Sequence, residues 1–170
     1  MTAWASSPSA AFSRRRSARL IDNHTIYNPA FATTEFRSPS FYETVRAVRT
    51  IAFERAAALP PLTPIILTVA PGRDPDWGRE WQHAIRALAD RCGDPLLGVH
   101  LHCDKEENIR RLASPSRALL RKLTDPTELD DGFERPVLLD HRDRVLRLDV
   151  TSLDPEEAAQ PILSWSTAQR

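Results

Sequence analysis

The sequence predicts one α/β domain built on a parallel sheet, with helices on both faces of that sheet. Short apolar segments alternate along the chain with longer segments that have a helical period. The apolar run at 64–70, PIILTVA, is rich in β-branched residues and does not alternate with polar ones, as expected for a strand covered on both faces. Together these observations indicate a three-layer architecture in which right-handed crossovers join parallel strands.

Length and charge set broad limits on function. The chain has 170 residues, enough for one domain with an adequate core. Its 23 basic and 23 acidic residues balance, so no overall field attracts nucleic acid or a membrane surface. Lysine occurs only at 105 and 122, so arginine supplies most of the positive charge. Arginine suits bidentate contacts with phosphate or carboxylate, although an arginine-rich genome explains the same bias.

The two cysteines and the absence of long apolar runs bear on location. Cys92 and Cys103 fit neither a disulfide framework nor a metal-ligand spacing. The sequence contains no run of about 18 apolar residues and no apolar core of a secretory signal. We therefore expect reduced thiols and a cytoplasmic protein. Residues 1–20 are rich in arginine and serine and lack acids, which leaves an organellar transit peptide as an alternative.

Residues 1–18 have no helical or strand period, so we expect a loose segment there. Strands are expected after it. The expected strands are residues 20–21, 64–70, 96–101 and 145–150. Acidic or hydroxyl side chains follow them, at Asp22, Asp74, Asp104 and 149–151. Because ligands of parallel sheets bind beyond the carboxyl ends of the strands, these residues indicate a ligand site. Acids that cap helices gather at the same places, which is the structural alternative.

Helices are expected between and after these strands. Residues 40–59 carry a capping-box pattern at Ser40 and Glu43, and the loop before them contains Pro29 and Pro39. The apolar stripe of this helix comprises Phe41, Val45, Val48 and Ala52. A second helix starts at Asp74-Pro75, has the stripe Trp77, Trp81, Ile85 and Leu88, and ends at Gly93.

The carboxyl-terminal half should contain further helices. Asp104, with Glu107 three residues on, is expected to cap a helix that runs to about Ala113. A short helix should follow at Ser114-Pro115, and a short helix and loop between 124 and 136. The last helix starts at Asp154-Pro155; Pro161 should shorten or kink it, and residues 166–170 form a tail.

Residues 101–131 combine a strand end, a capped helix and an arginine-bearing segment. They follow the pattern CDxxENxRRLxSPxR and then KLxDP. These runs resemble the lid segment of small P-loop kinases of the shikimate kinase, gluconate kinase and chloramphenicol phosphotransferase type, and particularly of their AAA-domain relatives. LIDNHTIYNP at 20–29 and LDVTSLDPEEAA at 148–159 resemble the second-strand and last-strand segments of the same proteins. The resemblance implies a P-loop kinase-like domain at 19–165, with its lid at about 113–131.

The resemblance also implies catalytic residues for ATP-dependent phosphate transfer to a small hydroxyl-bearing molecule. Asp22 would be the general base or would orient the acceptor hydroxyl, unless it only caps the turn that follows. Arg117 matches the lid arginine that approaches the transferring phosphoryl group, with Arg121 and Lys122 in support. The alternative for this segment is a solvated helix face.

Nucleotide-binding residues are implied in two further places. Arg110 or Arg111 would lie against the adenine ring, and the other of the pair would face solvent. Asp149, Val150 and Thr151 would border the adenine pocket through their backbone.

The motif that defines these kinases, G-x-x-x-x-G-K-[ST], is missing, since Gly72 is the first glycine and Lys105 the first lysine. That loop binds the phosphates, and its Ser or Thr binds Mg²⁺, so no metal ligand is assigned and ATP and Mg²⁺ are expected only with the loop restored. The central first strand of the 2-3-1-4-5 sheet would be missing too. Strands 64–70 and 96–101 then pair directly, the amino-terminal segment substitutes, or the start of the chain is truncated or diverged. We expect a kinase that is inactive as written, or a non-catalytic nucleotide-binding or regulatory protein.

Overall fold

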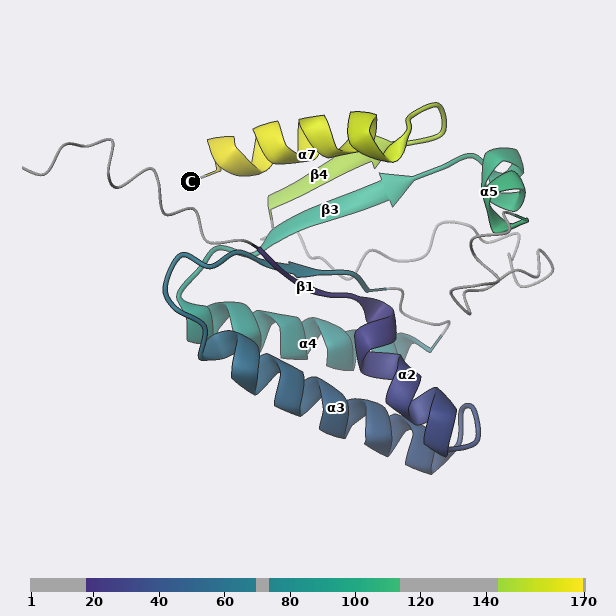
Figure 1. The fold of residues 1–170 in the computed structure, drawn as a ribbon, viewed down its shortest axis with the longest axis vertical. Helices are drawn as coiled ribbons and strands as arrows, with labels where there is room; N and C mark the ends of the chain where they lie inside the picture. Colours follow the sequence, from purple (N-terminus) through teal and green to yellow (C-terminus); the bar gives the residue numbers. More distant parts are fainter. Residues whose placement is uncertain (1–17, 70–73, 114–143, 170) are drawn as a thin grey trace, which may run out of the picture. The chain divides into compact units, whose positions relative to one another are not determined.

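The computed structural model describes residues 18–69, 74–113 and 144–169. These residues form five helices and two parallel sheets of two strands each, a mixed α/β structure (Figure 1). They divide into two compact units, one within 1–77 and 83–94 and the other within 78–82 and 95–170. Each unit is described by itself.

The sheet of the first unit pairs β1 (Arg19–Ile21) with β2 (Ile65–Leu67) in parallel. Leu20 lies opposite Ile66 on one face of this ladder, and these side chains are 60% and 50% exposed. Both side chains are thus about half exposed, and the expectation that residues 64–70 are covered on both faces stays a prediction.

Helix α2 (Asn23–Thr33) occupies a stretch for which the sequence predicted a loop, and that prediction was wrong. Asp22 caps it: its Oδ1 accepts from the Thr25 amide at 2.7 Å and from the Thr25 hydroxyl at 2.8 Å. Pro29 lies inside the helix, where proline removes a backbone donor and costs about 3 kcal/mol. The helix packs against α3 and buries Ile26, Tyr27 and Ala30. Burying two large side chains gains about 1.5–3 kcal/mol each, which offsets the cost of the proline.

Helix α3 (Pro39–Ala57) has its N-cap two residues before the serine that the sequence predicted. Ser38, not Ser40, is the N-cap, and its Oγ accepts from the Phe41 amide at 3.1 Å. Pro39 is the first helical residue, where its fixed φ is favourable and its missing N–H costs nothing. The buried face advances mostly in steps of four and comprises Phe41, Val45, Arg49, Phe53 and Ala56.

Helix α4 (Pro75–Cys92) has both of its predicted ends. Oδ1 of Asp74 accepts from the amides of Asp76 at 2.9 Å and Trp77 at 3.2 Å. Gly93 ends the helix with φ of 68°, a left-handed conformation that favours glycine. The Trp77 indole Nε1 donates to the Tyr27 hydroxyl at 2.8 Å, which satisfies the polar end of a buried tryptophan in the first unit.

The sheet of the second unit pairs β3 (Leu97–His102) with β4 (Arg144–Asp149) in parallel, each within one residue of the prediction. Helix α5 (Lys105–Leu112) follows the carboxyl end of β3, and α7 (Pro155–Ala168) follows β4 and packs against it (Figure 1).

Helix α7 continues through Pro161 to Ala168, so proline does not shorten it, and a kink at Pro161 stays a prediction. A complete capping box stabilises its start: Asp154 Oδ1 accepts from the Glu157 amide at 2.8 Å, and Glu157 Oε2 accepts from the Asp154 amide at 2.9 Å. Two satisfied donors in the first turn reduce the effect of one missing donor further along.

No helix in the described ranges combines the length and apolar character needed to cross a bilayer. The expected loose segment at 1–18, the short helices at 114–136 and the lid lie almost wholly outside the described residues.

Candidate functional site

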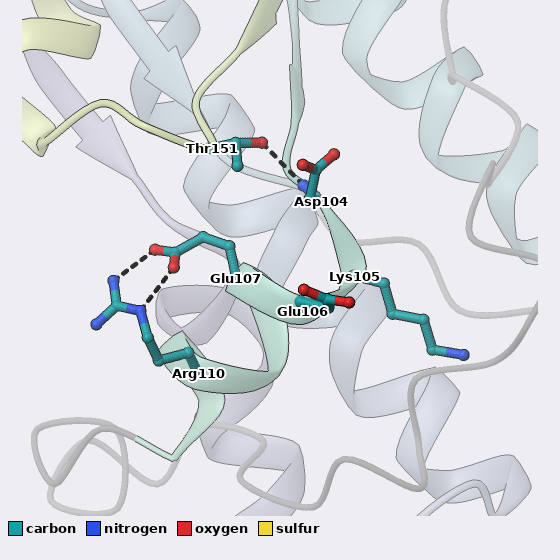
Figure 2. A pocket seen from close by; sticks show the side chains of 6 residues that line it. All are labelled: Asp104, Lys105, Glu106, Glu107, Arg110 and Thr151. Carbon is teal, nitrogen blue, oxygen red and sulfur yellow. Dashed lines mark hydrogen bonds and ion pairs between the residues drawn. The ribbon is translucent and has the colours of Figure 1, made fainter.

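The candidate site lies in the second unit, where β3 and β4 end side by side. His102 and Asp149 are the last partners of the ladder. Beyond them, the Asp104 amide donates to Thr151 Oγ1 at 2.9 Å, which ties the start of α5 to the turn after β4 (Figure 2). The Thr151 amide donates to Asp149 Oδ1 at 2.9 Å. Hydrogen bonds from the Thr151 hydroxyl and amide lower the pKa of Asp149, so this carboxylate stays charged.

An open pocket of about 620 Å³ lies over the start of α5. Its lining is charged or polar throughout and comprises Asp104, Lys105, Glu106, Glu107, Arg110 and Thr151. Three carboxylates face two cations, so the pocket carries one excess negative charge. In Figure 2, Lys105 extends away from Glu107 and Arg110, which leaves a local pair of opposite charges at one side of the pocket.

Glu107 and Arg110 form a two-pronged ion pair. The Arg110 Nε donates to Oε2 and its Nη2 to Oε1, both at 2.6 Å. The Glu107 side chain is 16% exposed and that of Arg110 is 74% exposed. Hydrogen bonds from Arg110 and then from Arg111 lower the pKa of Glu107 to about 2, and the carboxylate raises the pKa of Arg110. Both groups are therefore charged at neutral pH.

Arg111 turns in the other direction, towards the turn after β4. Its Nε donates to Glu107 Oε1 at 2.6 Å. Its Nη2 lies 2.7 Å from the carbonyl oxygen of Val150, 3.1 Å from that of Thr151 and 3.2 Å from that of Leu153. The Arg111 side chain is 34% exposed. This arginine thus joins α5 to a turn about forty residues away in the sequence.

The structure brings together two of the groups that the resemblance assigned to adenine. Arg110 and Arg111 lie on α5, and Asp149, Val150 and Thr151 end β4 next to it. Arg110, whose side chain is 74% exposed, lines the pocket, whereas Arg111 bonds to the β4 turn instead of facing solvent.

Glu107 was missed as a site residue because the sequence assigned it to a capping box. That assignment was wrong: Asp104 is the N-cap of α5 by position, but its side chain makes no capping hydrogen bond. Glu107 instead binds the arginines three and four residues later. That spacing places side chains on one helix face and was the signal present in the sequence.

The remaining site predictions lie elsewhere. Asp22 belongs to the first unit and acts there as the cap of α2; the Asn23 amide beside it donates to Thr68 Oγ1 at 3.0 Å. Arg117, Arg121 and Lys122 lie outside the described residues.

Within the described ranges, no group of three or more His, Cys, Asp and Glu side chains is placed to hold a metal ion. Comparison of the chain with protein-family models, curated proteins and solved structures found no match.

Proposed function

We propose that the pocket beside α5 binds the nucleoside end of an adenine nucleotide, in a P-loop kinase-like domain that holds its parallel sheet between two helical layers. One observation carries the proposal. The guanidinium of Arg110 is exposed at the pocket, and Glu107 holds it by one edge.

Pairing by one edge leaves the flat faces of a guanidinium open. The carboxylate of Glu107 occupies the Nε and Nη2 donors of Arg110 in a two-pronged contact, which fixes the plane of the group. A fixed, charged plane stacks favourably on an aromatic ring such as adenine. The Arg110 side chain is therefore ordered before the ligand binds, which reduces the entropic cost of binding.

The charge of the pocket favours the nucleoside over the phosphates. Asp104 and Glu106 offer carboxylate oxygens that accept hydrogen bonds from ribose hydroxyls or from the amino group of adenine. The same carboxylates repel a triphosphate, and Glu106 and Glu107 lie in the first turn of α5, where an anion would otherwise be favoured. The phosphates of a bound nucleotide would thus have to extend away from this pocket.

Phosphate transfer to a small hydroxyl-bearing molecule remains the activity that the kinase resemblance suggests. In that scheme Asp22 orients the acceptor and Arg117 faces the phosphoryl group. The 170 residues contain no G-x-x-x-x-G-K-[ST] motif. Since loss of one preorganised donor costs about 3–4 kcal/mol in other enzymes, we propose nucleotide binding without detectable transfer for this sequence.

We also propose a cytoplasmic location. Cys92 and Cys103 are free thiols and half-buried, a state that a reducing compartment preserves.

The proposal predicts a specific effect of Arg110→Ala on adenosine binding. Loss of the stacked guanidinium should weaken binding about two- to fivefold, because a cation–π contact at an exposed site contributes about 0.5–1 kcal/mol. Isothermal titration calorimetry with adenosine measures this directly.

Arg147→Ala is the matched control. Arg147 is also in the second unit, and its substitution removes the same charge. Its Nη1 lies on the sheet, 3.2 Å from His100 Nδ1. Adenosine affinity should be unchanged in this variant. Equal losses in the two variants would show a non-specific charge effect and contradict the assignment of Arg110.

A further inference from the structure

We infer that Arg111 is a positioning residue, which holds the turn Val150–Leu153 in the form that the nucleoside site requires. The identity of the ligand in this inference rests on the proposed function. The effect of Arg111 on the turn concerns the nucleotide-free protein and is testable without any ligand.

Arg111 supplements a weak closing bond in this turn. Its own closing bond, from the Leu153 amide to the Val150 carbonyl, is 3.3 Å long, at the weak end of the range. Arg111 adds contacts at 2.7, 3.1 and 3.2 Å to the carbonyls of Val150, Thr151 and Leu153. The Nη2 atom has two N–H groups for these three carbonyl acceptors, so at least one N–H group is shared between two carbonyls. Charge-assisted bonds of this kind are about twice as strong as neutral ones.

Thr151 is the turn residue that lines the pocket, and it is fixed at three points. Its amide donates to Asp149, its hydroxyl accepts from the Asp104 amide, and its carbonyl accepts from Arg111. The amide contact holds the peptide before Thr151, the hydroxyl contact holds its side chain, and the Arg111 contact holds the peptide after it. Without the Arg111 contact, the peptide that follows Thr151 loses its fixed orientation.

Glu107 sets the direction of Arg111. Its Oε1 accepts from the Arg111 Nε, so the guanidinium is held at one edge by α5 while Nη2 reaches the turn. Lysine has a single point charge without this fork and does not reproduce both contacts.

Arg110 provides an internal comparison. It binds the same carboxylate, but no hydrogen bond from it to the turn is found in the described residues. Removing Arg110 therefore removes one charge and one Glu107 partner while leaving the turn contacts in place.

The test is residue-specific amide hydrogen exchange by NMR in the nucleotide-free protein, comparing Arg111→Ala with Arg110→Ala. We expect the Leu153 amide to exchange about tenfold faster in Arg111→Ala, as loss of roughly one charged hydrogen bond implies. The Thr68 amide, bonded to Ile21 in the first unit, should be unaffected. In Arg110→Ala both amides should exchange as in the parent chain. If Arg111→Ala does not fold, Arg111→Lys is used, with a smaller change in the same direction.

Chemical rescue separates positioning from general stabilisation. Millimolar guanidinium chloride should restore slow exchange at Leu153 and adenosine affinity in Arg111→Ala, whereas sodium chloride at equal concentration should not. Unchanged exchange at Leu153, or acceleration spread equally over both units, would overturn the inference. Accelerated Leu153 exchange in a chain that never binds adenosine would support the clamp on the turn and refute the proposed ligand.

Discussion

Glu107 is the residue on which both arginines of α5 converge. Arg110 is bound through two donors and Arg111 through one, all at 2.6 Å. The first arginine presents a flat cation to the pocket, and the second holds the turn after β4. One carboxylate thus orients two side chains with different tasks, and its charge state governs both.

The pKa of Glu107 is a direct test of this convergence. We expect a value of about 2, below its ordinary 4.5, because Arg110 and then Arg111 donate hydrogen bonds to the charged form. A depressed pKa in the folded state means that the carboxylate contributes stability above pH 4.5 and loses it as the pH falls towards 2. Carboxyl ¹³C chemical shifts followed against pH measure the value. A midpoint near 4.5, or an unchanged acid profile of stability in Glu107→Gln, would contradict the arrangement.

Asp22 has two possible roles that substitution separates. As the cap of α2 it accepts from the Thr25 amide and hydroxyl. Asp22→Ala should lower the free energy of unfolding by about 1 kcal/mol, and Asp22→Asn should lose much less, because asparagine caps helices nearly as well. Urea denaturation of the two variants measures the difference. An equal loss in both would mean that the negative charge, and not the capping bond, stabilises this position.

At the scale of elements, the sequence predicted best where a cap and an apolar stripe agree. Helix α4 begins after Asp74 and ends at Gly93 as expected, and β3 and β4 lie within one residue of their predicted ranges. Helix α2 was missed because Pro29 dominated the local pattern, whereas packing against α3 decided the outcome. The spacing of Glu107 to the two arginines could be found in the sequence, but the bonds from Arg111 to the carbonyls of the β4 turn could not.

Pro29→Ala tests the account of α2. Alanine restores a donor for the helix and removes the proline clash, a gain of about 3 kcal/mol, less roughly 1 kcal/mol for the freer unfolded chain. We expect about 2 kcal/mol of net stabilisation by urea denaturation. Pro39→Ala, at the first position of α3, should instead lose up to about 1 kcal/mol, because proline there only restricts the unfolded state. A loss of stability in Pro29→Ala would show that the proline is well accommodated.

At the scale of the whole molecule, the described residues show two short parallel ladders, β1–β2 and β3–β4. Their order along the chain is that of the outer strand pairs in a 2-3-1-4-5 sheet, which is why the kinase-like fold remains our proposal. The proposed nucleoside pocket is contained within the second unit. The part that would bind phosphates has no counterpart in the sequence. We therefore propose that recognition of the base and sugar is separate from recognition of the phosphates.

The most direct test is to compare the dissociation constants of adenosine and of ATP with Mg²⁺ by calorimetry, with chemical shifts followed at residues 104–110 and 149–153. We predict shifts at these residues with both ligands, and affinities within about threefold of each other, a difference below 1 kcal/mol. ATP binding tighter by roughly a hundredfold, about 2.7 kcal/mol, would reveal a phosphate site that this account denies. Absence of binding by either ligand would contradict the nucleoside pocket itself.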